Sequence, residues 1–475
     1  MISNPFDCPY LRYFEIRGFS NFSYRLLTGF DIIPQIVPKL FNPMSQPILQ
    51  FLKTNNYKNL CLDKQVIINN LNIFIGANGS GKSNFISCLK FLKDCLTSLP
   101  DESRGISSFE DAVAKLGGNR ILDGNVESPA TLGISYCFSQ ISRTGDPKKD
   151  SGIFDLKLYV DKQTRVSITE ESLYSGEDLH ELGLPQPFYY YRFHNRQAGK
   201  GAVSVYELPG QSSRFQPLDD IPINALGLVV FPRLLEDSPF PPENAPVYKI
   251  RRELVEFITN WQFYNANNMD LHQIRTAEPQ IGRSDIYLSS SGDNLPLVLD
   301  NLNQNNIDFE DSINEAMKLI LPKTRRLRPI RSGRLSLTVE WYFEGIPEPF
   351  FLTDMSDGTV RMLCWATLLH SPVLPSLLVI DEPELGLHVS WMPILAEWIK
   401  QAAQKTQVIV TTHSPDLLDH FTDCLEKVLC FSSENRTHFS IKPLSQPMLE
   451  PKLEEGWQLG DLYRVGDPSI GGWPW

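Results

Sequence analysis

The chain has 475 residues, which is more than one ordinary hydrophobic core accommodates, so two or three lobes are expected. Hydrophobic residues make up 42% and charged residues 21%, a globular balance that excludes a mainly disordered or fibrous chain. The net charge of -12 argues against a protein coated in nucleic acid, although a local basic patch can still bind a phosphate backbone.

The N-terminal part of the chain predicts a strand, an insertion, a second strand and a helix. Residues 14–19 alternate like a strand, and residues 34–59, with prolines and asparagines, are typical of an insertion. Residues 66–75 are β-branched and apolar at both ends and lead directly into glycines, and residues 84–96 place apolar side chains at helical spacing. Strand, glycine-rich loop and helix in this order are the context that a phosphate-binding loop requires.

The middle of the chain alternates between strand-like and helix-like patterns. Strands are expected at 154–168 and 189–207, the second with a turn at 198–201, and helices at 249–265 and 309–321. Heptads are not sustained and prolines recur, so the sequence does not predict a long coiled coil.

Residues 76–83 read GANGSGKS and fit the phosphate-loop pattern G-x-x-x-x-G-K-[ST]. Glycines let backbone N–H groups close around phosphate oxygens, and the helix that follows directs the positive end of its dipole at the same anion. Lys82 adds a charge at the β/γ bridge, and the Ser83 hydroxyl is a ligand for Mg²⁺. A chance glycine-rich turn is the alternative. The predicted ATP-binding residues are Gly76, Asn78, Gly79, Ser80, Gly81, Lys82, Ser83 and Asn84.

Two more apolar strands end in polar side chains. Residues 377–380 are apolar throughout, like a central parallel strand, and precede Asp381 and Glu382. We predict that Asp381 holds Mg²⁺ and that Glu382 polarises the attacking water. Residues 408–412 form the other strand and precede His413, which is placed to bind the γ-phosphate and that water. Taken singly, these are also compatible with an acidic turn and a structural histidine. Taken with the phosphate loop, they predict a catalytic set of Lys82, Glu382 and His413.

A fourth motif, Ser356-Asp357-Gly358-Thr359, begins a helical stripe of mostly apolar residues. A hydroxyl and a glycine at a helix N-terminus suit an anion. Serine and aspartate are also good helix caps, so an ordinary capped helix remains an open alternative.

Together the four motifs resemble those of ABC ATPases in the RecF- or SMC-like form. Residues 76–84 are similar to the G-x-N-G-S-G-K-S-N loop of that branch, and residues 356–359 to its signature motif in the S-D-G-T form. Residues 381–388, DEPELGLH, resemble a Walker B motif with its D-loop, and residues 411–415, TTHSP, a switch-histidine motif. Both are similar to motifs of stand-alone bacterial AAA-family ATPases, which are OLD- or RecF-like without a Toprim domain or a long coiled coil. Residues 291–295 also resemble a piece of the helical insert of that subgroup.

This resemblance implies an α/β fold: a P-loop NTPase of ABC type with a mixed central sheet, helices on both sides, an antiparallel β subdomain and an inserted arm or lid domain. The expected division is an N-terminal lobe at 1–165, an insert at 166–322 and a C-terminal lobe at 323–475. It further implies ATP and Mg²⁺ as ligands and a homodimer, or a higher oligomer, closed by ATP. The signature of one subunit would then contact the nucleotide of the other through Ser356, Asp357, Gly358 and Thr359.

The sequence departs from the family pattern in three places. A convincing Q-loop glutamine is missing, and Gln140 is a candidate only because it ends a strand-like segment. Ser20 stands where a basic residue is usual, and the interval from Ser83 to Ser356 is far longer than in transporter relatives. The interval predicts an additional domain in place of the coiled coil of SMC proteins.

The leading functional hypothesis is an ATP-gated, DNA-associated ATPase in genome maintenance or anti-phage defence. Candidate DNA contacts lie in a cationic run without acids, at Lys323, Arg325, Arg326 and Arg328. A solvated loop or a dimer contact explains the same run equally well. Two other classes stay open: a regulatory scaffold that uses ATP as a switch, and the energising subunit of a transporter, which the long insert disfavours.

Too few residues follow His413 for the nuclease domain of OLD-type relatives, so the resemblance implies a separately encoded nuclease or Toprim-like effector. The eight cysteines form no C-x-x-C pair and indicate free thiols in a reducing cytosol. No run approaches the ~18 continuous apolar residues of a membrane span. We therefore expect a cytoplasmic protein without a membrane partner.

Overall fold

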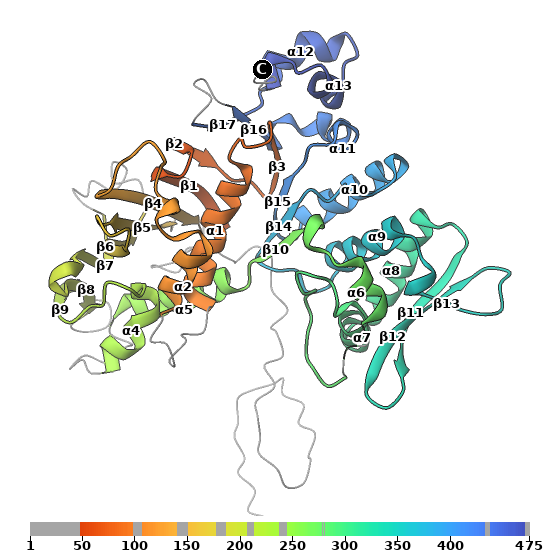
Figure 1. Ribbon diagram of the computed structural model, residues 1–475, viewed down its shortest axis with the longest axis horizontal. Coiled ribbons are helices and arrows are strands. Elements are labelled where there is room, and N and C mark those ends of the chain that lie inside the picture. Colours follow the sequence, from red (N-terminus) through yellow and green to blue (C-terminus); the bar gives the residue numbers. More distant parts are fainter. Residues whose placement is uncertain are drawn as a thin grey trace, which may run out of the picture. The chain divides into compact units, whose positions relative to one another are not determined.

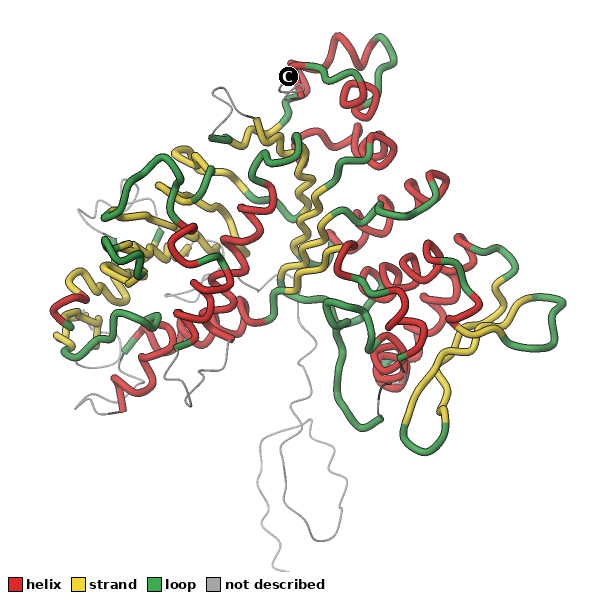
Figure 2. Tube along the Cα trace, in the orientation of Figure 1, coloured by secondary structure: helices red, strands yellow, loops and turns green. Residues whose placement is uncertain are grey.

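The computed structural model describes residues 48–97, 107–139, 151–176, 187–206, 213–236, 245–277, 279, 281–432 and 438–470 (Figures 1 and 2). The strand expected at 14–19, Ser20 and the Q-loop candidate Gln140 lie outside these residues. Between them, the described strands form sheets of eight, six and three strands. In this part of the chain, no helix combines the length and the apolar character needed to cross a bilayer.

The six-stranded sheet contains the apolar runs that the sequence singles out. In spatial order it consists of β10 (Gln262–Asn265), β14 (Leu377–Asp381), β15 (Gln407–Thr411), β3 (Leu71–Ile75), β16 (Val428–Ser432) and β17 (Ser440–Pro443). All neighbouring strands run parallel except β16 and β17. Continuous apolar sequence suits these strands because both faces of the sheet are buried. Leu377 and Val379 point into one hydrophobic core, and Leu378 and Ile380 point into another.

The eight-stranded sheet is antiparallel throughout. Its spatial order is β2 (Leu60–Ile67), β1 (Ile48–Tyr57), β4 (Ala130–Ser139), β5 (Ser151–Val160), β6 (Val166–Ser175), β7 (Tyr189–Asn195), β8 (Lys200–Tyr206) and β9 (Ser213–Leu218). The first core lies between this sheet and the six-stranded sheet. It also takes side chains from α1 (Lys82–Thr97), α2 (Ser108–Lys115), α4 (Gly227–Glu236) and α5 (Pro246–Thr259).

The second core covers the other face of the six-stranded sheet. It takes side chains from α10 (Met392–Ala403), α11 (Pro415–Leu418), α12 (Gln446–Glu454) and α13 (Leu459–Arg464). Figure 1 accordingly shows α1 and α10 on opposite sides of β14, β15 and β3. The central sheet is therefore mixed and covered by helices on both faces, as the sequence predicts.

A third group of elements joins the second core next to β14. It comprises α6 (Leu271–Thr276), α7 (Leu295–Asn305), α8 (Ile307–Ile320), α9 (Asp357–Leu369) and a small antiparallel sheet of β11 (Thr324–Ser332), β12 (Ser336–Phe343) and β13 (Phe350–Phe351). The expected boundary at 322/323 lies between α8 and β11. The one at 165/166 lies in the turn between β5 and β6, neighbouring strands of one sheet. The division into three parts remains a prediction.

Four expectations about single elements are wrong in part. The strand expected at 154–168 is two strands, β5 and β6, because residues 161–165 form a turn between them. Residues 48–57 of the expected insertion form β1, whose alternating burial marks a strand despite the nearby prolines. Residues 66–75 belong to two strands rather than one. The Asn72 side chain accepts from the Asn69 amide and donates to the Asn69 carbonyl, and these bonds stabilise the turn between β2 and β3. Residues 262–265 of the expected helix form β10, since α5 ends at Thr259 and the aromatic residues that follow favour a strand.

One buried side chain ties the two larger sheets together. Gln407, the first residue of β15, accepts a hydrogen bond from the Leu49 amide at 3.2 Å and donates to the Leu49 carbonyl at 2.7 Å. It also donates to the carbonyl of Asn69 at 3.1 Å. Leu49 belongs to β1 and Asn69 precedes β3. Because both ends of the buried amide are satisfied, it stabilises the junction without a desolvation penalty.

Candidate functional site

The loop between β3 and α1 has the backbone of an anion cradle. Gly76 and Gly81 have φ angles of +144° and +95°, which glycine adopts readily and other residues rarely do. A Cβ atom on Gly76 would lie 2.6 Å from the carbonyl oxygen of Phe431, so the loop could not close there with a side chain. Asn59, in the turn between β1 and β2, donates to the Gly79 carbonyl at 3.2 Å and accepts from Asn84 at 2.7 Å. No sequence motif assigns Asn59 to this loop.

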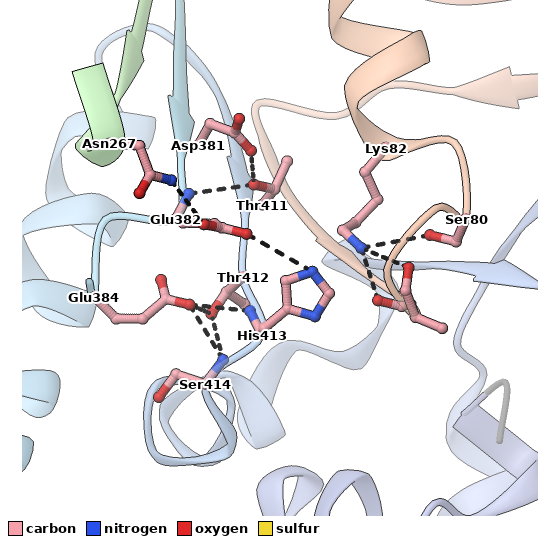
Figure 3. Close-up of polar contacts among 12 residues, drawn as sticks. Ser80, Lys82, Asn267, Asp381, Glu382, Glu384, Thr411, Thr412, His413 and Ser414 are labelled. Atoms are coloured by element: carbon pink, nitrogen blue, oxygen red, sulfur yellow. Dashed lines mark hydrogen bonds and ion pairs between the residues drawn. The ribbon is translucent and has the colours of Figure 1, made fainter. Parts of the chain in front are cut away.

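Lys82 is buried inside the loop, with 7% of its surface exposed. Its Nζ atom donates to the carbonyl oxygens of Gly76 at 2.7 Å and Ala77 at 3.1 Å (Figure 3). Burial lowers the pKa of Lys82 to about 8, and the nearby Asp381 and Glu382 carboxylates oppose this shift. The ammonium group therefore points into the loop, where a phosphate oxygen is a better partner than a neutral carbonyl.

Asp381 and Glu382 follow each other at the end of β14 but have different environments. The Oδ1 atom of Asp381 accepts a hydrogen bond from the Thr411 hydroxyl, which comes from the end of β15. The backbone N–H of Glu382 donates to the Thr411 carbonyl at 3.0 Å. Glu382 has a φ angle of +54°, in the left-handed region that costs a residue with a side chain free energy. Such strain occurs where a side chain must point in one particular direction, as it does at catalytic sites.

His413 completes this group from the segment after β15. Its Nε2 atom lies 3.8 Å from Oε1 of Glu382 (Figure 3). Burial, assisted by the positive charge of Lys82, lowers the pKa of His413 to about 4. The imidazole is therefore neutral at neutral pH and can donate a hydrogen bond through only one ring nitrogen.

Glu384 holds the backbone on which His413 lies. Its Oε1 atom accepts hydrogen bonds from the Thr412 hydroxyl at 2.7 Å and from the backbone N–H groups of His413 at 3.0 Å and Ser414 at 3.2 Å. Burial raises the pKa of Glu384, and its Oε2 atom has no partner among the described residues. The sequence motif DEPELGLH contains Glu384, but the spacing alone did not reveal this supporting role.

Two asparagines, one at the end of β10 and one just after it, join the site, and sequence reasoning missed both. Asn265 pairs in register with Asp381 and donates to its Oδ2 atom at 2.5 Å. Asn267 donates to Oε2 of Glu382 at 3.2 Å. The same segment contacts the helix of the fourth motif, because Arg361 of α9 donates to the Ala266 carbonyl at 2.5 Å. A polar pair at the end of a strand was the available signal, but this segment was assigned to a helix.

The fourth motif lies at the start of α9. Ser356 caps this helix by accepting from the Thr359 amide at 3.3 Å, and the Asp357 carboxylate lies 2.5 Å from Arg275. A Cβ atom on Gly358 would lie 2.9 Å from the Trp391 ring. Among the described residues, no recorded hydrogen bond joins 356–359 to the loop at 76–84. The structure thus brings Lys82, Asp381, Glu382 and His413 together and records no such bond from the signature residues to the loop.

The cationic run lies on β11 and just before it. Arg326 pairs with Glu310 at 2.6 Å, and Arg328 lies 3.3 Å from Glu340 and over the Tyr342 ring. Lys323 and Arg325 are exposed. Part of the positive charge is thus balanced by acids on neighbouring elements, which the sequence could not show.

The residues present fit a nucleotide with Mg²⁺. The loop offers open backbone at Gly79, a buried ammonium group at Lys82 and an exposed hydroxyl at Ser83. Mg²⁺ in proteins is commonly held by one or two protein oxygens together with phosphate oxygens and water. Ser83 and Asp381 are the residues that would hold it, and the ion would neutralise charge on the β- and γ-phosphates.

A model of a known protein family matches most of the chain. The family model described as "AAA domain, putative AbiEii toxin, Type IV TA system" matches residues 71–124 and 161–419, more than half of the chain. The loop at 76–84, the signature at 356–359, the carboxylates of Asp381 and Glu382, and His413 all lie inside the matched residues. A search of curated proteins gives no match.

Among solved structures, the chain is similar to heads of Smc proteins. An SmcHead bound to the C-winged helix domain of ScpA is 12% identical, with a TM-score of 0.47, and the likeness covers 84% of this chain and 99% of that one. An Smc head domain with an extended coiled coil, bound to the C-terminal domain of ScpA derived from Pyrococcus furiosus, is 13% identical, with a TM-score of 0.44 and coverage of 86% and 99%. The SMC head domain from Thermotoga maritima is 12% identical, with a TM-score of 0.39 and coverage of 84% and 99%.

Proposed function

Because the chain belongs to the AAA domain family described for the putative AbiEii toxin, with the P-loop NTPase fold of ABC type in its RecF/SMC-like form, we propose that it binds and hydrolyses ATP. One observation carries the proposal: three segments far apart in the sequence meet at one place. Lys82 begins α1, Glu382 follows β14 and His413 follows β15, with 3.8 Å between the last two side chains.

In this proposal each group has a separate task. The loop amides and Lys82 bind the phosphates, and Ser83 and Asp381 hold Mg²⁺. Glu382, the carboxylate whose side chain is aimed by a strained backbone, accepts the proton of the attacking water. The Nε2–H of a neutral His413 donates to the γ-phosphate as the bond to the leaving oxygen breaks. Asn267 and Asn265 orient the two carboxylates.

Phosphate release from ATP and Mg²⁺ tests this function, with the Lys82→Ala and Glu382→Gln variants. We expect Lys82→Ala to lose ATP binding, since it removes the only charge in the loop that faces the phosphates. Glu382→Gln keeps the shape of the site and should bind ATP normally while its kcat falls by roughly 10²-fold or more, the usual contribution of a general base. Equal turnover by wild type and Lys82→Ala would refute the proposal.

We further propose that two subunits share the nucleotides. The signature residues Ser356 and Asp357 are exposed at the start of α9, where they are available to a partner. Next to them, Leu385 of the D-loop and Val389, just after it, are 39% and 57% exposed. Gly358 packs against Trp391 and the carbonyl of Gly386, so the signature and the D-loop form one surface. Apolar side chains beside polar anion-binding groups suit a contact that closes around a bound nucleotide.

Beyond ATP hydrolysis by a dimer, we propose that the ATPase acts on DNA together with a separately encoded effector, such as a nuclease or Toprim-like protein. Lys323 and Arg325 are exposed and form no ion pair recorded among the described residues, which supports a phosphate contact on this face. The description of the family, a toxin of a type IV toxin–antitoxin system, is compatible with anti-phage defence. Duplex DNA added to the phosphate-release assay should raise turnover in low salt.

A further inference from the structure

A tyrosine from the C-terminal part of the chain reaches the site. Tyr463 lies on α13, beyond the residues that the family model matches. Its hydroxyl lies 3.1 Å from Nδ1 of His413 and 3.4 Å from the carbonyl oxygen of Gly76 in the phosphate loop. The side chain is 6% exposed. The proposed function assigns no role to this contact.

The position of Tyr463 is fixed by the segment that follows His413. The Gly460 amide donates to Oδ1 of Asp419 at 2.8 Å, and the Leu459 amide donates to the Thr422 hydroxyl at 3.0 Å. A Cβ atom on Gly460 would lie 2.1 Å from the carbonyl oxygen of Pro415, so α13 approaches α11 as closely as only glycine permits. Helix α13 and the chain after His413 therefore hold each other in one arrangement.

The tyrosine hydroxyl has one proton, and two groups in its recorded contacts, Nδ1 of His413 and the Gly76 carbonyl, can accept it. The Gly76 carbonyl already accepts from Lys82 at 2.7 Å, and its distance to the hydroxyl is the longer of the two. Donation to Nδ1 of His413 uses the shorter contact. It leaves the imidazole proton on Nε2, the nitrogen that faces the Glu382 carboxylate. The hydrogen bond at one ring nitrogen commonly decides which tautomer a neutral histidine adopts.

We propose that Tyr463 is the positioning residue of His413: its hydroxyl donates to Nδ1 and thereby holds the ring in the Nε2–H tautomer, aimed at Glu382 and the γ-phosphate. This inference rests on the proposed ATP hydrolysis and extends it to a residue outside the four motifs. The low pKa of His413 agrees with it, because only a neutral ring has a tautomer to select.

A double-mutant cycle tests the proposal in the complete protein. Tyr463→Phe removes only the hydroxyl, so kcat should fall roughly three- to tenfold, the range for one neutral hydrogen bond, while KM for ATP stays unchanged. In a His413→Ala background the same substitution should have no further effect, because the group it positions is gone. Tyr174→Phe, which removes a hydroxyl bonded to Asp155 on the antiparallel sheet, is the matched control and should leave kcat unchanged.

A spectroscopic measurement tests the same proposal and does not depend on ATP hydrolysis. Nitrogen-15 chemical shifts of labelled histidine, assigned with His413→Ala, should show His413 as the Nε2–H tautomer in wild type and as a mixture in Tyr463→Phe. An unchanged tautomer, or an equal fall in kcat with and without His413, overturns the inference. If the wild type does not hydrolyse ATP, the proposed function fails, and the nitrogen-15 shifts alone still decide whether Tyr463 positions the ring.

Discussion

Single residues at this site differ in how far the sequence reveals them. Lys82 and Ser83 could be predicted because the phosphate loop is one short run with a fixed spacing, and glycine is required where the backbone closes. Asp381, Glu382 and His413 were predicted from their positions after apolar strands. Phosphate release by the Lys82→Ala and Glu382→Gln variants tests the roles predicted for this site.

Supporting residues could not be predicted in the same way. Asn59, Asn267 and Tyr463 come from a turn, a segment after a strand and a short helix, and none belongs to a motif. Each acts through a side-chain contact to a group that lies 20 residues away for Asn59, 115 for Asn267 and 50 for Tyr463. No pattern in a single sequence indicates that such a contact forms.

Asn267 gives a prediction at the scale of one side chain. Asn267→Ala removes the amide that holds Oε2 of Glu382 at 3.2 Å, so the carboxylate should sample other rotamers. We expect kcat to fall by about tenfold, with the dissociation constant for ATP unchanged. The exposed neighbour Asn268 offers a matched control, since Asn268→Ala deletes an amide that makes no recorded contact with the carboxylates. Equal loss in both variants would show that only the segment, and not the hydrogen bond, matters.

Among helices and strands, hydrophobic periodicity predicted the long elements well. Helices α1 and α8 and strands β14 and β15 lie within a few residues of their expected bounds, because their apolar side chains recur at the spacing of one element. Strand β10 was missed since it is short and continues an amphipathic helix without a break in apolar character. Its partner β14 defines it as a strand, and that pairing lies far away in the sequence.

The packing of three helices around His370 gives a prediction for stability. His370 is the C-cap residue of α9. Its Nδ1 atom lies at hydrogen-bond distance, 3.2 Å, from the Ser312 hydroxyl of α8, and its ring packs edge-on against Trp398 of α10. Burial lowers the pKa of His370 to about 4. Below the pKa of about 6.5 that histidine has in an unfolded chain, the unfolded state binds a proton that the folded state does not. Stability is therefore lost as the pH falls from about 6.5 towards 4.

Chemical denaturation at pH 7.5 and pH 5.5 measures this effect. The wild type should lose about 1 kcal/mol of unfolding free energy through His370 between these conditions. His370→Gln, which cannot take up the proton, should lose less on acidification even if its stability at pH 7.5 is lower. His272→Gln changes an exposed histidine on α6 and should follow the wild type. The same loss in all three proteins would exclude His370 as the source.

The arrangement of the whole molecule follows from the sequence only in outline. The family resemblance implied an α/β fold with a phosphate loop and an antiparallel β subdomain. The number and order of strands in the eight-stranded sheet could not be predicted, because strand pairing joins segments that loops separate in the sequence. The sheet continues across residue 165, where the sequence suggested a boundary, because β5 and β6 pair along their length. Composition shifts mark linkers, whereas pairing between strands decides which segments share a sheet.

A shared site between two subunits gives a prediction for the assembled protein. Lys82→Ala removes the phosphate contact, and Ser356→Arg obstructs the exposed signature surface, so each variant alone should be inactive. Mixed in equal amounts, they should recover part of the wild-type phosphate release, because one site of the mixed dimer combines an intact loop with an intact signature. Glu382→Gln should also become dimeric in ATP by light scattering.

Ser107→Arg is the control for this experiment. Ser107 caps α2 as Ser356 caps α9, so the substitution removes a comparable helix cap without touching the signature. It should retain activity alone. A mixture of Lys82→Ala and Ser356→Arg that is no more active than its components, together with monomeric Glu382→Gln at every ATP concentration, would contradict the shared site.

The two ends of strand β15 have different roles. Hydrogen bonds hold its first residue in place, and its C-terminal end leads into the proposed catalytic site. Gln407 anchors its start to Leu49 and Asn69, while Thr411 and His413 lie at its far tip. A lengthwise slide of the strand would break all three hydrogen bonds of Gln407, two of them buried, each worth about 1 kcal/mol. We therefore expect His413 to respond to a bound nucleotide through rotation of its ring and movement of the few residues after β15. The strand itself should keep its position.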